Sequence, residues 1–482
     1  MAISILPRPA LRLASASWRA VVAAPLIALG LGACASYHAQ PLHPQQSARI
    51  FAARRLDSPA LRAAITRLLP QRPSQWPPSQ WNRAELLAVA LADNPQLAVA
   101  RAEVGRTLAQ QITAGEMPNP TIGLQSEYAL DDAHPWLYGV SFELPLRSPT
   151  LRRLAISQAR IATSHARWQL MGATWTVRSE LIGALSDWQS ALRRGTFLDA
   201  LIGDQQQLLT EQRARVHAGE DAPATLVPVQ DALLQAQLQR GEVRADAQHA
   251  QSDAAAALGL PPQALDDLRL EWSHWGTPPP VSADELHGAR ARALLSRADL
   301  SAAIDDYAEA ENRLRQAIAR QYPQITLLPG YYWDHGIRKF PFDVNLTLPL
   351  FNRNQGEIAE ARAGRELAGQ RMLALQDSIY GEIAGAERAA SIAHANENAA
   401  QQRLHDAREQ LRQASLGLEL GAIDRGGQLA ARIVVTRAQL DLLQTQSRWQ
   451  AARDALEDAL RAPLSGPELG MGRQESNTGV RR

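Results

Sequence analysis

Two short stretches decide the fold of this chain: FELPL at residues 142–146 and LTLPL at residues 346–350, separated by 204 residues. Three further pairs occur in the same order in both halves of the chain: PTIGL at 120–124 with PQITL at 323–327, AQL at 236–238 with AQL at 438–440, and AL at 257–258 with AL at 459–460. Ordered matches at a nearly constant offset of 202–204 residues indicate an internal duplication.

Each copy predicts the same order of elements. A helical stretch (83–114; 283–319) precedes a β-hairpin, which is followed by a very long helix (151–218; 352–420), a Gly-containing turn and a shorter helix (222–258; 424–461). In the first long helix, apolar or small residues from Ala155 to Ala191 recur every 3.6 residues, which is the period of one helical face. At about 1.5 Å per residue such a helix is on the order of 100 Å long. A coiled-coil scaffold would also use helices of this kind.

The hairpins argue for a membrane-spanning sheet instead. Apolar and polar residues alternate from Trp136 to Leu144 and from Phe342 to Leu350, and aromatic residues lie near the strand ends. Strands of about ten residues with one apolar face match a barrel that surrounds water in a membrane. A soluble sheet with one wet face is the alternative. Four strands cannot close a membrane barrel, since the smallest have about eight, so the membrane interpretation requires an oligomer.

Composition excludes several classes of protein. The 482 residues carry 50 Lys+Arg against 49 Asp+Glu, a net charge of +1, which gives no argument for nucleic-acid binding. A single cysteine excludes a disulfide within the chain and a cysteine-based zinc site. We find no nucleotide-binding loop and no hydrolase or metalloprotease motif, so no catalytic residue, no cofactor and no enzyme activity are predicted. The dispersed histidines predict no metal site.

The N-terminus predicts export. Three arginines precede an apolar stretch from Ala20 to Ala33, and Cys34 follows this stretch directly. A stretch of this length suits the apolar region of a signal peptide and is short for a spanning helix. The ending LGAC resembles the bacterial lipoprotein signal, which implies that Cys34 becomes the lipidated first residue of the mature chain and that the protein is anchored to the outer membrane. An ordinary signal with an incidental cysteine is the alternative.

These observations predict six segments. They are a signal peptide (1–33), an irregular N-terminal wrap (34–81), a first repeat (82–258), a Pro-rich linker (259–282), a second repeat (283–462) and a tail (463–482). Most of the length is therefore expected to be drawn out in helices and hairpins instead of folded into globular cores.

The chain resembles the TolC-like outer-membrane factors, also called outer membrane efflux proteins, over residues 80–462. The residues that carry the resemblance are LADNPQL at 91–97, PNP at 118–120, RADL at 297–300 (where the family more often has Pro at the second position) and LPLFNRNQGEI at 348–358. The last of these is most similar to the heavy-metal (cobalt–zinc–cadmium type) efflux branch. The first copy departs from that branch at LRSPT, residues 146–150.

The resemblance implies a mainly α-helical protomer with two β-hairpins, three of which form a twelve-stranded outer-membrane β-barrel joined to a periplasmic α-barrel. It implies a homotrimer in outer-membrane lipid that works with a periplasmic adaptor and an inner-membrane pump of the resistance-nodulation-division type. The expected function is passive efflux, of heavy-metal cations first, with multidrug efflux or type I secretion as the alternative. A periplasmic coiled-coil scaffold without a pore is a remote alternative.

The turns after the long helices are the candidate gate. Gly219 and Asp221 lie in the first turn, and Gly421, Asp424 and Arg425 lie in the second. The resemblance implies that these tips dock the adaptor and narrow the pore, and three-fold symmetry would make a ring of three from each acid. The alternative is that the acids only cap the returning helices. Acidic residues and histidines in the hairpin loops, between 131 and 134 and at 334–335, could also attract cations.

Overall fold

The computed structural model describes residues 36–69, 75–279 and 281–469. The chain forms two compact units, Met1–Phe51 and Ala52–Arg482. The first is described from residue 36 and contains most of helix α2 (Pro44–Ala52). All further elements belong to the second unit, and Cys34 lies outside the described residues.

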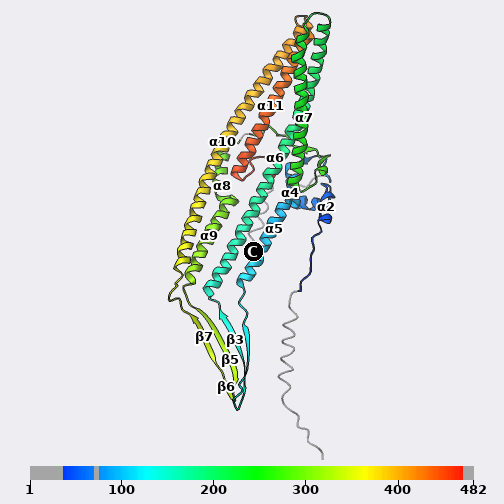
Figure 1. Cartoon of the computed structure of the whole chain (residues 1–482). Helices are drawn as coiled ribbons and strands as arrows, with labels where there is room; N and C mark the ends of the chain where they lie inside the picture. The colour runs from blue at the N-terminus through cyan, green and yellow to red at the C-terminus, as the bar shows by residue number, and fades with distance from the viewer. Residues whose placement is uncertain (1–35, 70–74, 280, 470–482) are drawn as a thin grey trace, which may run out of the picture. The chain divides into compact units, whose positions relative to one another are not determined.

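The second unit contains the same succession of elements twice (Figure 1). The first copy consists of α4 (Arg83–Asp93), α5 (Pro95–Gly115), β2 (Thr121–Tyr128), β3 (Trp136–Leu146), α6 (Pro149–His217), η1 (Pro223–Thr225) and α7 (Leu226–Leu258). The second consists of α8 (Ala283–Ser296), α9 (Ala298–Ala319), β5 (Gln324–Asp334), β6 (Ile337–Lys339), β7 (Phe342–Thr347), α10 (Gln355–Glu419) and α11 (Arg425–Leu460). The duplication and the long helices predicted from the sequence are confirmed.

The two long helices begin and end for local reasons. Helix α6 has 69 residues and starts at Pro149, whose fixed φ suits the first helical position. Helix α10 has 65 residues and follows Asn354, which adopts a left-handed conformation with φ +62°. Both helices end before a glycine with positive φ, +78° at Gly219 and +71° at Gly421.

The predicted helices 83–114 and 283–319 are each broken into two. In the first copy Asn94 ends α4 and caps α5, and its Nδ2 donates to the carbonyl of Ala257 (2.8 Å). In the second copy Arg297 occupies the break, and its Nη1 donates to the carbonyl of Ala459 (2.6 Å). Two unlike side chains therefore join equivalent breaks to equivalent carbonyls near the ends of α7 and α11.

The hairpins form one sheet. Strand β3 pairs antiparallel with both β2 and β5, with Val140 opposite Leu124 on one side and Tyr331 on the other. Strands β6 and β7 pair in succession with β5, so the five strands occupy four positions across the sheet. The backbone of Gly139 lies against Tyr332, where a Cβ would fall 2.1 Å from the ring, so this crossing requires glycine.

The main core lies where the first copy meets the segments that flank it. Its most deeply buried members are large aliphatic side chains from α3, α4, α5, α6, α7 and the following linker: Leu61, Ile65, Leu86, Leu97, Leu181, Leu185, Leu258, Leu260 and Leu265. A parallel pair of short strands, β1 (Trp81–Asn82) and β4 (Leu270–Glu271), joins the segment before the first copy to the linker after it. A second core connects α8, α10 and α11.

The N-terminal wrap is less irregular than the sequence predicts. Residues 44–68 contain α2 and α3 (Pro59–Leu68). The hydroxyl of Ser58 caps α3 by accepting from the N–H of Leu61, and Pro59 fills the first helical position. Leu61 and Ile65 then bury one face of this short helix in the main core.

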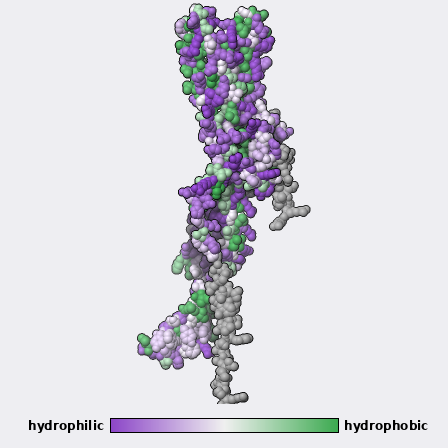
Figure 2. All heavy atoms as spheres, turned by 90° about the vertical axis from the view of Figure 1, so that its right-hand side faces the viewer, coloured by the Kyte–Doolittle hydropathy of each residue, from purple (hydrophilic) through white to green (hydrophobic). Residues whose placement is uncertain are grey.

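Large apolar side chains of the sheet are exposed in the single chain. Ile122 is 60% exposed, Leu124 83% and Phe342 63%, and Figure 2 shows hydrophobic residues at the surface of the sheet as well as along the helices. Among the helices of the described part of the chain, none is long and apolar enough to cross a membrane.

Candidate functional site

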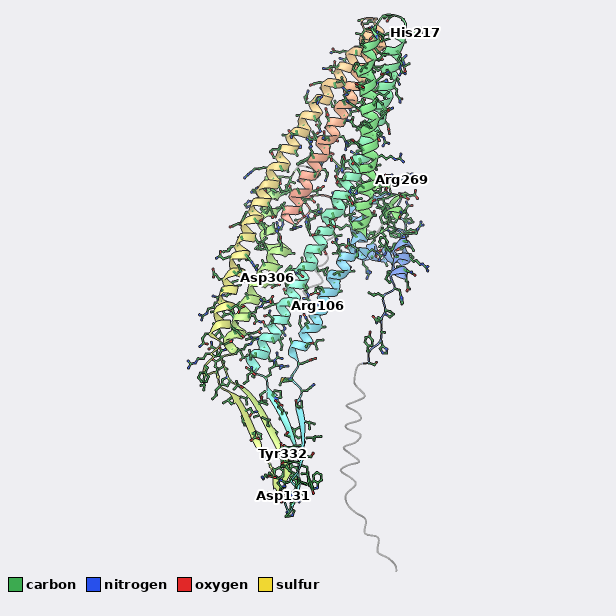
Figure 3. The ribbon with its side chains drawn as sticks, in the orientation of Figure 1. Arg106, Asp131, His217, Arg269, Asp306 and Tyr332 are labelled. Carbon is green, nitrogen blue, oxygen red and sulfur yellow. The ribbon has the colours of Figure 1, made fainter. Side chains whose placement is uncertain are left out.

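The tips predicted from the sequence lie at the ends of the long helices that are opposite to the hairpins. Figure 3 shows His217, the last residue of α6, at one end and Asp131, in the first hairpin loop, at the other. One helix of each copy thus connects the apolar sheet to a polar turn.

The two turns have the same backbone design. In the first, the N–H of Glu220 donates to the carbonyl of Arg215 (2.9 Å) across Gly219. In the second, the N–H of Ala422 donates to the carbonyl of Gly417 (2.7 Å) across Gly421. Each bond satisfies one carbonyl in the last turn of α6 or α10, and the left-handed glycines make it possible.

Arg215 joins the two turns. Its Nε donates to Oδ2 of Asp221 (2.7 Å), and its Nη1 donates to Oδ2 of Asp424. Gln212 also donates to Asp221, at 2.8 Å. Both acids named in the sequence analysis therefore contact one guanidinium, and the single chain presents them as an ion-pair network instead of free carboxylates.

The alternative of helix capping holds for one acid and not for the other. Oδ1 of Asp424 accepts from the N–H of Gly427 (2.8 Å), so Asp424 is the N-cap of α11. Asp221 lies before η1 but is not its N-cap. That position is occupied by Ala222, which makes no side-chain hydrogen bond to the helix. Asp221 is held by Arg215 and Gln212, and the hydrogen bond from Arg215 lowers its pKa.

Further ion pairs join α6 to α11 beside the tips. Nε of Arg425 lies 3.4 Å from Oε1 of Glu211. Nη2 of Arg432 lies 2.6 Å from Oδ1 of Asp204 and donates to Gln207 at 2.8 Å. All these pairs lie between the helix pair of the first copy and that of the second.

Arg215, which bridges the two turns, was not predicted from the sequence. Aligning the two copies at an offset of 202 places Gly417 opposite Arg215 and Ile423 opposite Asp221. Gly417 packs against Ile423, where a Cβ would lie 3.5 Å from Cγ1. An arginine and an acid in one copy that replace a glycine and an isoleucine in the other are the signal that could have revealed the pair.

The hairpin loops also bring charged groups together. Nδ1 of His335 lies 2.8 Å from the carbonyl oxygen of His134 and 3.6 Å from Oδ2 of Asp132. Lys339 pairs with Asp334 in the same loop region. Within the described residues, no group of three or more His, Cys, Asp and Glu side chains is placed to hold a metal ion.

The motif at residues 348–358 forms the joint between the sheet and α10. Nδ2 of Asn354 donates to the carbonyl of Ala317 in α9 (2.8 Å) and to Oε2 of Glu357 (3.1 Å). Glu357 also pairs with Arg320 at 3.0 Å. These residues have a structural role in positioning the start of the long helix.

Comparison with known proteins agrees with this geometry. Residues 289–460 match the family model described as outer membrane efflux protein. Over these residues the chain is similar to the outer membrane efflux proteins. A comparison of the sequence with curated proteins finds no match.

Most of the chain shares the fold of solved outer-membrane channels. The outer membrane protein VceC from Vibrio cholerae has a TM-score of 0.64 and 19% identity, over 80% of this chain and 97% of VceC. The outer-membrane channel OprN has a TM-score of 0.66 and 15% identity, over 89% of this chain and 99% of OprN. The MtrE outer membrane channel of Neisseria gonorrhoeae has a TM-score of 0.62 and 17% identity, over 79% of this chain and 89% of MtrE. At these identities the likeness establishes the fold.

Proposed function

We propose that the protein is the outer-membrane exit channel of a tripartite efflux system and acts as a passive duct. The observation that carries the proposal is that each copy uses one long helix to connect an exposed apolar hairpin to a polar tip (Figure 3). An apolar sheet suits lipid, and a helix on the order of 100 Å long suits a conduit that crosses the periplasm.

The number of strands supports a trimer. The sheet occupies four positions, and its outer strands β2 and β7 each pair with one neighbour among the described strands. Unpaired strand edges are unfavourable in lipid, where every backbone polar group needs a partner. Three copies would supply twelve positions and could close the sheet into a barrel.

The tips are proposed as the closed gate and the docking point for a periplasmic adaptor. Arg215 bridges Asp221 and Asp424 and so holds the helix pairs of the two copies together at this end. These groups are exposed or half-exposed, so water and salt weaken the bridge and a partner could exchange it for contacts of its own. Gly219, Gly421 and Arg425 belong to the same surface.

Cys34 is proposed as the lipid anchor. The LGAC ending after the apolar stretch supports it, and acyl chains would hold the N-terminus at the inner leaflet of the outer membrane. Metabolic labelling with palmitate, followed by the same labelling of Cys34→Ser, tests the anchor. A lipid label that persists in the variant would contradict it.

The cargo is proposed to be heavy-metal cations, delivered by an inner-membrane pump of the resistance-nodulation-division type. The support is the sequence motif at 348–358 alone, and the structural role of Asn354 reduces its weight as a marker of cargo. Growth of a deletion strain on metal salts, antibiotics and dyes tests this part. Sensitivity to drugs with normal growth on metals would favour multidrug efflux, and loss of an exported protein would favour type I secretion.

The channel itself is tested by fractionation and by conductance in a planar bilayer. The protein is expected in the outer-membrane fraction as a trimer that carries ion current. A coiled-coil scaffold would carry none. Asp221→Asn and Asp424→Asn are expected to change cation preference or open probability, and unchanged values in both variants would remove the acids from the gate without removing the channel.

A further inference from the structure

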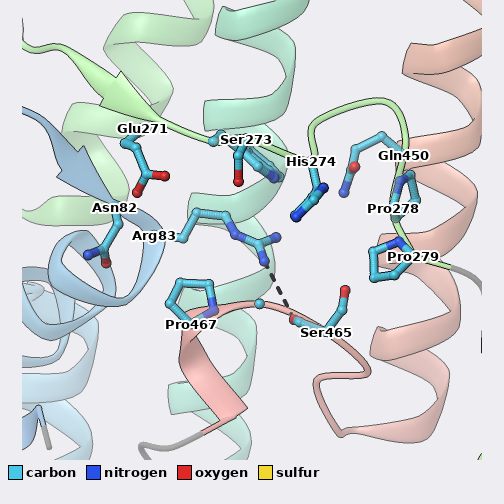
Figure 4. A pocket seen from close by; sticks show the side chains of 12 residues that line it. Asn82, Arg83, Glu271, Ser273, His274, Pro278, Pro279, Gln450, Ser465 and Pro467 are labelled. Atoms are coloured by element: carbon cyan, nitrogen blue, oxygen red, sulfur yellow. Dashed lines mark hydrogen bonds between the residues drawn. The ribbon is translucent and has the colours of Figure 1, made fainter. Parts of the chain in front are cut away.

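A pocket of about 330 Å³ lies between the start of the first copy, the linker and the end of the second copy. Its lining contains no residue of the tips or the hairpins. It is lined by residues from the start of α4, the segment after β4, α11 and the C-terminal segment (Figure 4). No function proposed above uses it.

Arg83 occupies the middle of this pocket. Its side chain is 7% exposed, and its guanidinium lies 4.6 Å over the ring of Trp272. Both hydrogen bonds that it makes to described residues come from Nη2, to Glu468 (3.3 Å) and to the carbonyl of Ser465 (3.5 Å). Figure 4 shows the guanidinium between Ser273 and His274 on one side and Ser465 on the other.

The group beneath the pocket contains arginine donors without hydrogen-bond acceptors in the described part of the chain. A cluster of charged side chains, which we call the buried ion cluster, surrounds Arg83. In it Arg83, Arg178, Arg453, Glu457 and Glu468 are buried, and Asp454 is partly buried. Burial raises the pKa of Glu468, and it raises the pKa of Asp454 to about 7. Asp454 is therefore protonated in part near neutral pH, and Nε and Nη2 of Arg453 have no hydrogen-bond partner among the described residues. The cluster therefore contains guanidinium donors that its acids do not pair.

The opposite side of the pocket has a different character. Glu271 and Asn82 lie on the far side of Arg83 from His274 (Figure 4). Pro278, Pro279 and Pro467 add apolar wall. A ligand that fits this lining carries a carboxylate at one end, an N–H donor within reach of Glu271 and a small apolar body.

We propose that this pocket binds the carboxylate end of a short peptide or of an acylated amino acid, with the carboxylate on Arg83 and His274 and an N–H group facing Glu271. An arginine that presents two donors to a carboxylate gives both affinity and orientation. The proposal does not depend on the channel function, because binding at this pocket requires neither current nor a partner protein.

The test titrates the purified full-length protein with N-acetyl-L-alanyl-L-alanine and with its C-terminal amide. The acid is expected to bind. The amide should bind at least about tenfold more weakly, since it cannot form a charge-assisted hydrogen bond with Arg83. Inorganic phosphate serves as the third probe. Binding of phosphate as tightly as the peptide acid would overturn the assignment of a peptide carboxylate.

Variants locate the site. His274→Gln lies at the exposed mouth and is expected to weaken binding of the acid several-fold, while His249→Gln, an exposed histidine on α7, should leave it unchanged. Arg83→Gln should abolish binding and Arg83→Lys retain part of it, with thermal unfolding as the check on folding. If Arg83→Gln does not fold, the His274 pair decides. Equal binding of acid and amide, no binding to the wild type, or unchanged binding in His274→Gln would each overturn the proposal.

Discussion

The tips and the buried ion cluster both pair arginines with acids, but the pairs at the tips face water and those of the cluster are largely buried. At the tips, Arg215 is 40% exposed and serves two acids that also face water. In the cluster, Arg178 is 7% exposed and Oε2 of Glu457 lies 2.6 Å from its Nη2. Glu457 in addition accepts from the N–H groups of Leu464 (2.9 Å) and Ser465 (3.3 Å).

The difference concerns what happens when a bond breaks. An exposed pair that opens is solvated by water, so its loss changes the free energy little and the structure can exchange it for another contact. A buried pair that loses one partner leaves a charge without solvent. We therefore expect the cluster to act as a fixed joint between α4, α6 and α11, and the tips to act as a reversible contact.

Arg178→Ala should give the largest loss of stability. It leaves the buried carboxylate of Glu457 without the guanidinium that donates to it, at a cost of about 3–5 kcal/mol in the free energy of unfolding. Thermal unfolding followed by circular dichroism measures it, with Arg215→Ala as the matched control. A similar shift in both variants would remove the distinction between the joint and the tips.

Gly466→Ala should also destabilise the joint. Gly466 has φ +106°, and a Cβ there would lie 1.9 Å from Nη2 of Arg83 and 2.4 Å from Oε2 of Glu468. Backbone strain together with displacement of this ion pair is expected to cost about 1–3 kcal/mol. Gly219→Ala is the control, because its φ is +78° but no atom lies within 4 Å of the added Cβ. A larger loss at Gly219 would contradict the account.

Asp454→Asn should change the pH dependence of stability. Burial raises the pKa of Asp454 to about 7, so between about pH 4 and 7 the folded wild type binds a proton that the unfolded chain has released. Stability of the wild type then falls as pH rises through this range, and the variant lacks this part of the slope. Groups around the carboxyl are Gln450, Glu457, Arg83 and Arg178.

The measurement is the unfolding midpoint of wild type and variant at pH 5 and pH 8. The free energy of unfolding of the variant, relative to that of the wild type, should be higher at pH 8 than at pH 5 by on the order of 1 kcal/mol. Asp199→Asn, an exposed acid paired with Arg240, should show no such gain. A pH-independent difference between Asp454→Asn and the wild type would show that the carboxyl does not titrate in this range.

Arg215→Ala should have the smallest effect on stability and a clear one on the gate. Removing the bridge to Asp221 and Asp424 frees the tips, so the open fraction of the channel should rise while the unfolding midpoint changes little. Single-channel recording measures the open fraction. Arg240→Ala removes an exposed pair with Asp199 on the same helix pair, away from the tips, and should leave gating unchanged.

Much of the fold could be predicted because it depends on periodicity and repetition. The predicted limits of α6 and α10 lie within three residues of the observed ones, since a proline or asparagine at the start and a glycine at the end mark them. The breaks at Asn94 and Arg297 were missed, although Pro95 signals the first. The second depends on a bond from Arg297 to Ala459, which is distant in sequence.

The candidate site was predicted only in outline. Gly219, Gly421 and the acids at the turns follow from local sequence, whereas the bridge from Arg215 to Asp424 joins residues 209 positions apart. The pairing of β1 with β4 and the pocket at Arg83 likewise arise from segments that no local pattern connects. Contacts of this kind depend on how the two copies pack, which periodicity does not specify.

The central claim is that the chain forms a channel, and conductance tests it most directly. The purified full-length protein, added to a planar lipid bilayer, is expected to insert as trimers and give stepwise ion current, with a higher open fraction in Arg215→Ala than in Arg240→Ala. Protein that remains monomeric in the presence of lipid and gives no current steps, in the wild type and in both variants, would contradict the account.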